Sequence, residues 1–143
     1  MTDDRLVVDT WGWLSLADAK EPRHSAVRTR LAALWNDGGT AITTDYVLDE
    51  TFTLVFRRLP VPKALRFLTT IERGEKDGTL RIERISGERF ARAKALRRRF
   101  RDKPLISFTD LSTMAVMEEL RLRRIVTSDA HFSHVGLGFE LLP

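Results

Sequence analysis

Short apolar runs and longer stretches with helical spacing alternate along this chain of 143 residues. The short runs, such as LVV before Asp9 and RIVT at 124–127, have the length and composition of buried strands. The run at 79–85 alternates apolar and charged residues imperfectly, which indicates an exposed or edge strand. Strands are therefore predicted at 5–9, 40–43, 79–85, 124–127 and 140–142.

Between these runs, apolar residues recur at the three- and four-residue spacing of a helix that faces a core. Leu48, Phe52 and Val55 form one such stripe. Glycine and proline signals, such as Asp37-Gly38-Gly39, end several of the segments. Helices are predicted at 11–19, 23–36, 45–58, 62–77, 86–100 and 109–122.

Short strands that alternate with helices are typical of an α/β protein, here a three-layer sandwich with a mostly parallel central sheet flanked by helices. The length suits one domain, expected to span residues 1–143. In such sheets, ligands bind beyond the carboxyl ends of the strands. Candidate functional residues are therefore sought where the strands end.

The composition restricts the chemistry of any site. The chain contains no cysteine, which excludes disulfides and thiolate metal ligands and permits a cytoplasmic location. Any metal must be held by oxygen or imidazole. No uncharged apolar run approaches the roughly 18 residues of a membrane span. The start, MTDDRLVVD, is unlike a signal peptide.

Positive charge is concentrated in one segment. The chain has a net charge of +4, but residues 81–103 hold ten basic and three acidic residues, a net charge of +7. Such a basic segment suits an anionic partner such as nucleic acid, with Arg97, Arg98 and Arg99 as candidate contacts. Taken alone, such a run of charges favours a solvated helix surface over a binding surface.

Two acids lie where the fold prediction places a site, and a third could join them. Asp9 ends the run LVV, Asp129 closely follows IVT, and Asp110 stands at the start of a predicted helix. Each also has a structural explanation, since aspartate caps helices, starts turns and favours helix N-termini. Asp9 is the least easily explained in this way, because it follows a buried strand.

A fourth acid is expected from the helix at 45–58. Periodicity alone does not distinguish Glu50 from Asp45 or Asp49, and a solvated surface role suits each of them. If the carboxylates converge, their repulsion requires a cation. Mg²⁺ and Mn²⁺ prefer oxygen ligands, and they support phosphodiester hydrolysis.

Four motifs together resemble the PIN-domain family, and specifically its VapC-type ribonuclease toxins. They are LVVDTWGWL, TTDYVLDET, SFTDLSTMAVMEEL and IVTSDAHF, in that order along nearly the whole chain. The resemblance implies a parallel sheet of order 3-2-1-4-5 and an acidic Mg²⁺ or Mn²⁺ centre. It selects Glu50 over Asp49 on the second motif. The implied catalytic and metal-binding acids are Asp9, Glu50, Asp110 and Asp129, with supporting hydroxyls from Thr127 and Thr10.

The resemblance also implies a function and partners. It indicates an endoribonuclease toxin that hydrolyses RNA, a cognate small antitoxin protein and a homodimer. The lack of a long apolar run predicts no membrane association. The alternative is a PIN-like scaffold that binds RNA or protein without cutting it. Trp13, Phe56 and Phe67 are apolar residues predicted to exceed the needs of the core, and they are candidates for the dimer interface.

Two tryptophans and a histidine each have more than one possible role. Position 11 is commonly small in the family, whereas here it is Trp11, which could stack on an RNA base. Both Trp11 and Trp13 could instead pack in the core or at a dimer interface. His131 could contact a phosphate or act as a general acid, but a supporting or capping role is favoured.

Overall fold

The computed structural model describes residues 4–143, and its strands form one five-stranded sheet. The strand order is β3-β2-β1-β4-β5, and every pairing is parallel. This confirms the predicted order and α/β class. The strands are β1 (Arg5–Val8), β2 (Thr40–Thr44), β3 (Leu80–Glu83), β4 (Arg124–Val126) and β5 (Glu140–Leu142).

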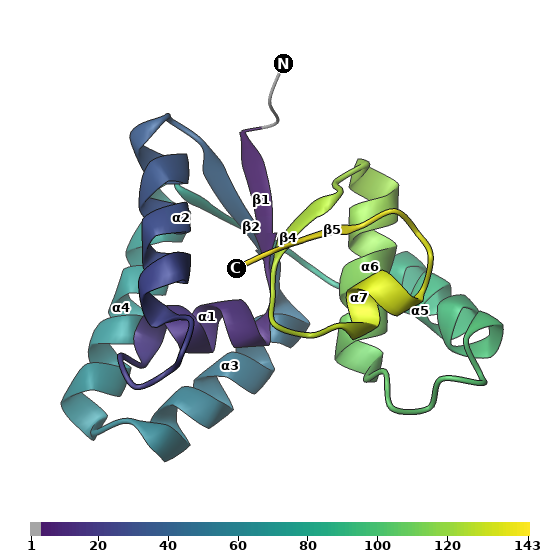
Figure 1. Cartoon of the computed structure of the whole chain (residues 1–143), viewed down its shortest axis with the longest axis horizontal. Helices are drawn as coiled ribbons and strands as arrows, with labels where there is room; N and C mark the ends of the chain where they lie inside the picture. The colour runs from purple at the N-terminus through teal and green to yellow at the C-terminus, as the bar shows by residue number, and fades with distance from the viewer. Residues whose placement is uncertain (1–3) are drawn as a thin grey trace.

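Helices cover both faces of the sheet, as Figure 1 shows. One side carries α1 (Thr10–Ala17), α2 (His24–Asn36), α3 (Asp45–Arg58) and α4 (Val61–Asp77). The other carries α5 (Gly87–Arg99), α6 (Phe108–Leu120) and α7 (His131–His134). This confirms the three-layer sandwich. No helix within residues 4–143 combines the length and apolar character needed to cross a membrane.

The alternation of β1 explains why two cores form. Leu6 and Val8 point into the core shared with α1–α4, whereas Val7 points into the core shared with α5–α7. Because the central strand is covered on both faces, its three buried residues, Leu6, Val7 and Val8, are all apolar. The first polar position after β1 therefore falls at the carboxyl edge of the sheet.

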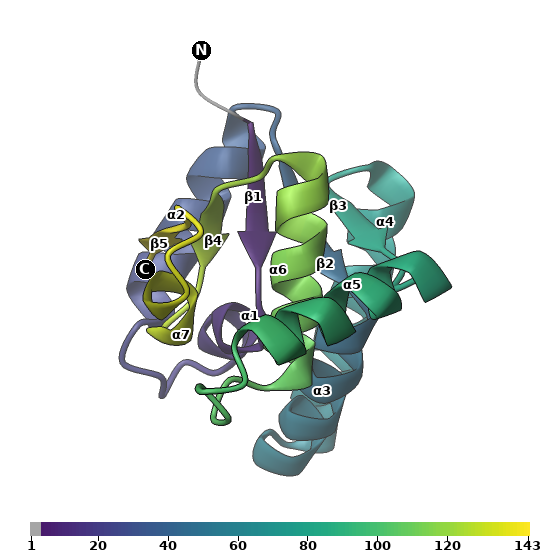
Figure 2. The ribbon, with the colours of Figure 1, turned by 90° about the vertical axis from the view of Figure 1, so that its right-hand side faces the viewer.

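Several helices begin at or near that edge with a side-chain cap. The Ser107 hydroxyl accepts the backbone N–H of Asp110 at 3.0 Å, and the Thr44 hydroxyl accepts that of Val47 at 3.0 Å. Figure 2 shows β1 pointing to the place where α1 begins, with the start of α6 nearby. Short loops and caps thus bring helix N-termini to one edge.

The structure differs from the sequence predictions at a few places. Most predicted boundaries shift by one or two residues, and β3 is shorter than the predicted 79–85. The helix α7 was not predicted, because four residues are too few for a periodic signal. Trp13 and Phe67 are buried in the core at 1% and 8% exposure, so the prediction that they form an interface was wrong. Phe56 is exposed.

Candidate metal centre

Asp9 combines a cap with burial at the carboxyl end of β1. Its Oδ1 accepts the backbone N–H of Gly12 at 2.8 Å, which caps α1. Its side chain is nevertheless almost completely buried, at 2% exposure. A helix cap on the surface would need no such burial, so the carboxylate is held inside at the edge of the sheet for another reason.

Thr127 connects β4 to Asp9. Its hydroxyl donates a short hydrogen bond to Asp9 Oδ2 and accepts the backbone N–H of Asp129 at 2.9 Å. Thr127 therefore orients both acids that follow the two central strands. Arg23, which the sequence did not single out, donates to the Thr127 carbonyl at 3.3 Å. No local pattern could reveal that contact, because 104 residues separate the two positions.

Asp110 and Glu50 approach from helices. Asp110 lies in the first turn of α6 and shares a side-chain hydrogen bond with Asp129. Glu50 lies half-buried on α3 and interacts electrostatically with both Asp9 and Asp110. The structure therefore brings together the four acids that the resemblance selected.

The other two acids of the second motif have different surroundings. Asp45 accepts the backbone N–H of Ile85 at 2.9 Å and that of Tyr46 at 3.1 Å, which ties α3 to the end of β3. Asp49 is exposed on α3. The charge of Glu50 is among the main causes that raise the pKa values of Asp9 and Asp110, whereas those of Asp45 and Asp49 are not. The structure therefore associates Glu50, and neither of the other two acids, with the centre.

Burial and mutual repulsion disfavour negative charge at this centre. The pKa of Asp9 is raised from 3.8 to about 7, mainly by desolvation on burial and to a lesser extent by the charges of Asp129 and Glu50. Hydrogen bonds from Thr127 and Gly12 oppose this increase. Burial is also the main cause that raises the pKa of Asp110, followed by its hydrogen bond with Asp129.

The cluster has the features of a site for a hard cation. None of the ion pairs that lysine and arginine form within residues 4–143 includes one of the four acids. Ligand atoms of Asp110, Asp129 and His131 lie within 4.8 Å of one another. Oxygen-rich clusters of this kind suit Mg²⁺ or Mn²⁺, so the residues present fit such an ion.

His131 stands beside this cluster at the start of α7. Its backbone N–H donates to Asp129 Oδ1 at 2.9 Å, which fixes the turn after β4. Its Nδ1 is buried 3.0 Å from the same oxygen, without the geometry of a hydrogen bond. The backbone contact agrees with the supporting role favoured for His131, and the ring nitrogen faces the acids.

The remaining predicted site residues differ in their surroundings. Thr10 is buried as the first residue of α1, whereas Trp11 is 37% exposed. The Arg97 guanidinium is used inside the protein, since it donates to the carbonyls of the segment after α5. Arg98 and Arg99 are exposed.

The fold and the centre define an α/β protein with a carboxylate-rich candidate metal site at the carboxyl edge of a parallel sheet. The PIN domain family model matches residues 6–137. The chain belongs to the PIN domain family, as the four motifs predicted. The comparison with curated proteins gave no match.

Two solved structures extend this likeness to VapC toxins. VapC20 of Mycobacterium tuberculosis, described as a toxin that cleaves the sarcin-ricin loop, is 26% identical, with a TM-score of 0.78 over 96% of this chain and 99% of that chain. VapBC2 from Rickettsia felis, bound to a promoter DNA fragment, is 17% identical, with a TM-score of 0.73 over 97% of this chain and 99% of that chain.

Proposed function

We propose that this chain is a Mg²⁺- or Mn²⁺-dependent endoribonuclease of the VapC type, the toxin of a toxin–antitoxin pair. The observation that carries the proposal is the convergence of Asp9, Glu50, Asp110 and Asp129 at one edge of the sheet. Membership of the PIN domain family and the likeness to VapC20 support it.

The residues of the chain have distinct tasks in this proposal. Asp9, Asp110, Asp129 and Glu50 would hold the ion. When bound, it would stabilise charge on a phosphate and activate a water for attack on the RNA backbone. Thr127 keeps the Asp9 and Asp129 carboxyls in position through its two hydrogen bonds. The substrate is RNA, and the reaction hydrolyses a phosphodiester bond.

Two partners belong to the proposal. The first is a cognate small antitoxin protein, supported by the VapBC2 structure. The second is another copy of the chain, and the homodimer remains a prediction. A cytoplasmic location is also proposed, because the RNA substrate and the antitoxin are expected there.

The test compares two acids of the centre with an exposed acid that neighbours one of them on α3. Labelled single-stranded RNA is incubated with the protein and Mn²⁺ or Mg²⁺, and with EDTA as the metal-free control. Asp9→Asn and Glu50→Gln should each lower the cleavage rate on the order of 100-fold or more, because each removes an acid from the ion site. Asp49→Asn is the matched control and should cleave as the wild type does, since Asp49 is exposed on the same helix.

Expression in bacteria provides the second measurement. The wild type and Asp49→Asn should arrest growth, whereas Asp9→Asn should not, with folding checked by circular dichroism. An Asp9→Asn protein that still cleaves RNA and arrests growth would contradict the proposal. A wild type that binds RNA but cleaves none with either ion would favour the scaffold instead.

A further inference from the structure

An exposed tryptophan and an arginine form a pair at the end of α1 nearest the acidic centre. The guanidinium carbon of Arg58 lies 5.4 Å from the centroid of the Trp11 ring. The Trp11 residue and the Arg58 side chain are each 37% exposed. Trp13, by contrast, is buried and donates through Nε1 to Thr43 at 3.1 Å. Of these two tryptophans, only Trp11 is available to a ligand.

The pair is connected to the proposed metal site through α1 and α3. Trp11 follows Asp9 by two residues and belongs to the first turn of α1, which Asp9 caps. Arg58 follows Glu50 by eight residues on α3, a rise of about 12 Å. Trp11 is therefore on the helix that Asp9 caps, and Arg58 is on the helix that carries Glu50. Because Trp11 is in the helical turn that Asp9 caps, a strand whose phosphate reaches Asp9 can extend to the Trp11 ring.

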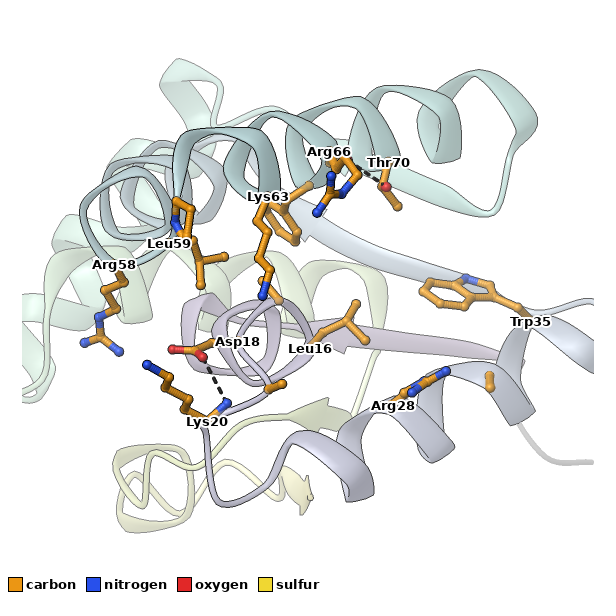
Figure 3. Close-up of a pocket in the computed structure, with 15 residues that line it drawn as sticks. Leu16, Asp18, Lys20, Arg28, Trp35, Arg58, Leu59, Lys63, Arg66 and Thr70 are labelled. Atoms are coloured by element: carbon orange, nitrogen blue, oxygen red, sulfur yellow. Dashed lines mark hydrogen bonds between the residues drawn. The ribbon is translucent and has the colours of Figure 1, made fainter.

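The charge around the pair suits a polyanion. Arg58 lines a groove of about 820 Å³ between α1, α2 and α4, and Figure 3 shows it at the same end as Lys20. The other basic residues along the groove are Arg28, Lys63 and Arg66, and Asp18 is the acid among the lining residues. Arg58 also forms an exposed ion pair with Glu21 at 3.2 Å, so four basic residues besides Arg58 face one acid in the groove. This excess of positive charge favours phosphate-bearing ligands over neutral ones at this surface.

The chemistry of the pair indicates which part of an RNA it contacts. An indole ring stacks on nucleobases whatever their identity, and a guanidinium adds a planar cation to the same surface. Unpaired bases of single strands and loops are the parts of RNA free to stack in this way. A protein partner with an acidic or aromatic side chain is the competing occupant of the same surface.

We propose that Trp11 and Arg58 form a base-stacking subsite for the RNA strand that reaches the acidic centre. The subsite rests on the proposed ribonuclease function, since it names the part of the substrate that is bound next to the site of cleavage.

Equilibrium binding in EDTA tests the subsite without cleavage. A fluorescently labelled single-stranded RNA is titrated with wild type, Trp11→Phe and Trp11→Ala. Loss of one stacked base should weaken binding of Trp11→Ala by about 5- to 100-fold, with Trp11→Phe intermediate. Phe56→Ala, which removes another exposed aromatic residue from α3, is the matched control and should change affinity less than about twofold.

RNAs with single abasic positions separate stacking from other contacts. The wild type should lose affinity when the stacked base is missing, whereas Trp11→Ala should bind the intact and abasic RNAs equally. Arg58→Lys keeps the charge but loses the planar group, so it should weaken binding, while Arg57→Lys, one residue earlier on α3, should not. Thermal unfolding confirms that each variant is folded, and Trp11→Phe preserves a ring should Trp11→Ala fail to fold.

The outcomes separate this proposal from the ribonuclease function. Three results would each overturn the subsite. Trp11→Ala could bind RNA as tightly as the wild type, or it could lose the same affinity for intact and for abasic RNA. The third is that the wild type binds no RNA. A protein that shows the Trp11-dependent binding but no cleavage with metal would overturn the function and leave the subsite standing. RNA cleavage with no role for Trp11 in binding would leave this surface to a protein partner.

Discussion

At the scale of single residues, Asp9 shows how much of a site can depend on one buried carboxyl. Its Oδ1 caps α1 and its Oδ2 accepts the Thr127 hydroxyl, so both oxygens are already positioned in the folded chain. Holding the ionised Asp9 carboxylate in this position lowers the stability of the folded protein, because burial and the neighbouring acids oppose its ionisation. A bound cation would offset that cost.

This cost predicts a pH dependence of the metal-free protein. The pKa of Asp9 is about 7 in the folded chain and near 3.8 when exposed, so the folded state binds a proton more tightly. Stability is therefore greatest below about pH 4 for this group and decreases as the pH rises to about 7. Urea unfolding in EDTA should give a free energy of unfolding lower at pH 8 than at pH 5, by up to a few kcal/mol.

Asp9→Asn and added Mn²⁺ are the controls for this dependence. The variant should lose the part of the pH effect that Asp9 contributes. Mn²⁺ should stabilise the wild type more at pH 8 than at pH 5, because binding requires ionised carboxyls. A free energy of unfolding that rises steadily from pH 5 to pH 8 without metal, unchanged by Asp9→Asn, would contradict the prediction.

At the scale of elements, the close approach of α1 to the sheet decides where Asp9 and Thr127 meet. A Cβ added to Gly12 would lie 2.5 Å from the Val126 carbonyl oxygen and 2.7 Å from Val8 Cγ1. Backbone cannot move aside as a flexible side chain can. Glycine at this position therefore lets the first turn of α1 rest against the ends of β1 and β4.

Gly12→Ala should accordingly destabilise the protein by about 1–3 kcal/mol and lower RNA cleavage, because α1 must move from β4. Gly87→Ala is the matched control, since Gly87 opens α5 with open space around it, and there alanine should be neutral or stabilise by about 0.5–1 kcal/mol. Chemical denaturation measures both. Equal effects of the two substitutions would show that helix propensity, not the contact with Val126, decides the outcome.

Arg97 differs from its neighbours Arg98 and Arg99, because its side chain binds backbone carbonyls whereas theirs are exposed. Its guanidinium donates to the carbonyls of Ile106 at 2.5 Å and of Phe100 and Lys103 at 2.7 Å each. These bonds hold the segment between α5 and α6, which leads to the cap of the helix that carries Asp110.

Arg97→Met should lower the free energy of unfolding by about 1–3 kcal/mol, because it leaves partly buried carbonyls without their donor. Arg98→Met changes the neighbouring exposed arginine and should stay within about 0.5 kcal/mol of the wild type. The comparison uses urea unfolding of both variants. An Arg97→Met protein as stable as Arg98→Met would show that the three hydrogen bonds contribute nothing.

At the scale of the whole molecule, positive charge is distributed over two surfaces. The net charge is +4, and basic residues gather both on α5 and along the groove between α1, α2 and α4. Charge attracts RNA without distinguishing its sequence, whereas stacking contributes independently of salt. The two contributions can therefore be separated by ionic strength.

RNA binding should weaken by about 50-fold as salt rises from about 50 to about 200 mM if about four cations contact phosphates. Lys63→Gln should make the salt dependence shallower by about 0.7 in the logarithmic slope, because it removes one groove cation. Trp11→Ala should lower affinity at every salt concentration and leave the slope unchanged. Lys63→Gln with the slope of the wild type would show that RNA does not follow the groove.

The sequence by itself determined the layers and marked Asp9, Asp110 and Asp129 as candidate acids, and its resemblance predicted the strand order. Periodicity located the helices, and the short apolar runs located the strands, because both patterns are local consequences of burying one face. Asp9 stood out since it ends a buried strand. Glu50, however, could be separated from Asp45 and Asp49 only by the resemblance or by the structure.

Only the tertiary structure decided how side chains distant in the sequence pair with one another. It placed Thr127 against Asp9, Arg58 against Trp11, and the Arg97 guanidinium on backbone carbonyls. It also buried Trp13 while leaving Trp11 exposed, although both lie on one helix. Such outcomes depend on packing between elements, and no local pattern encodes them: a run of arginines or two nearby tryptophans looks uniform until the fold assigns each a different environment.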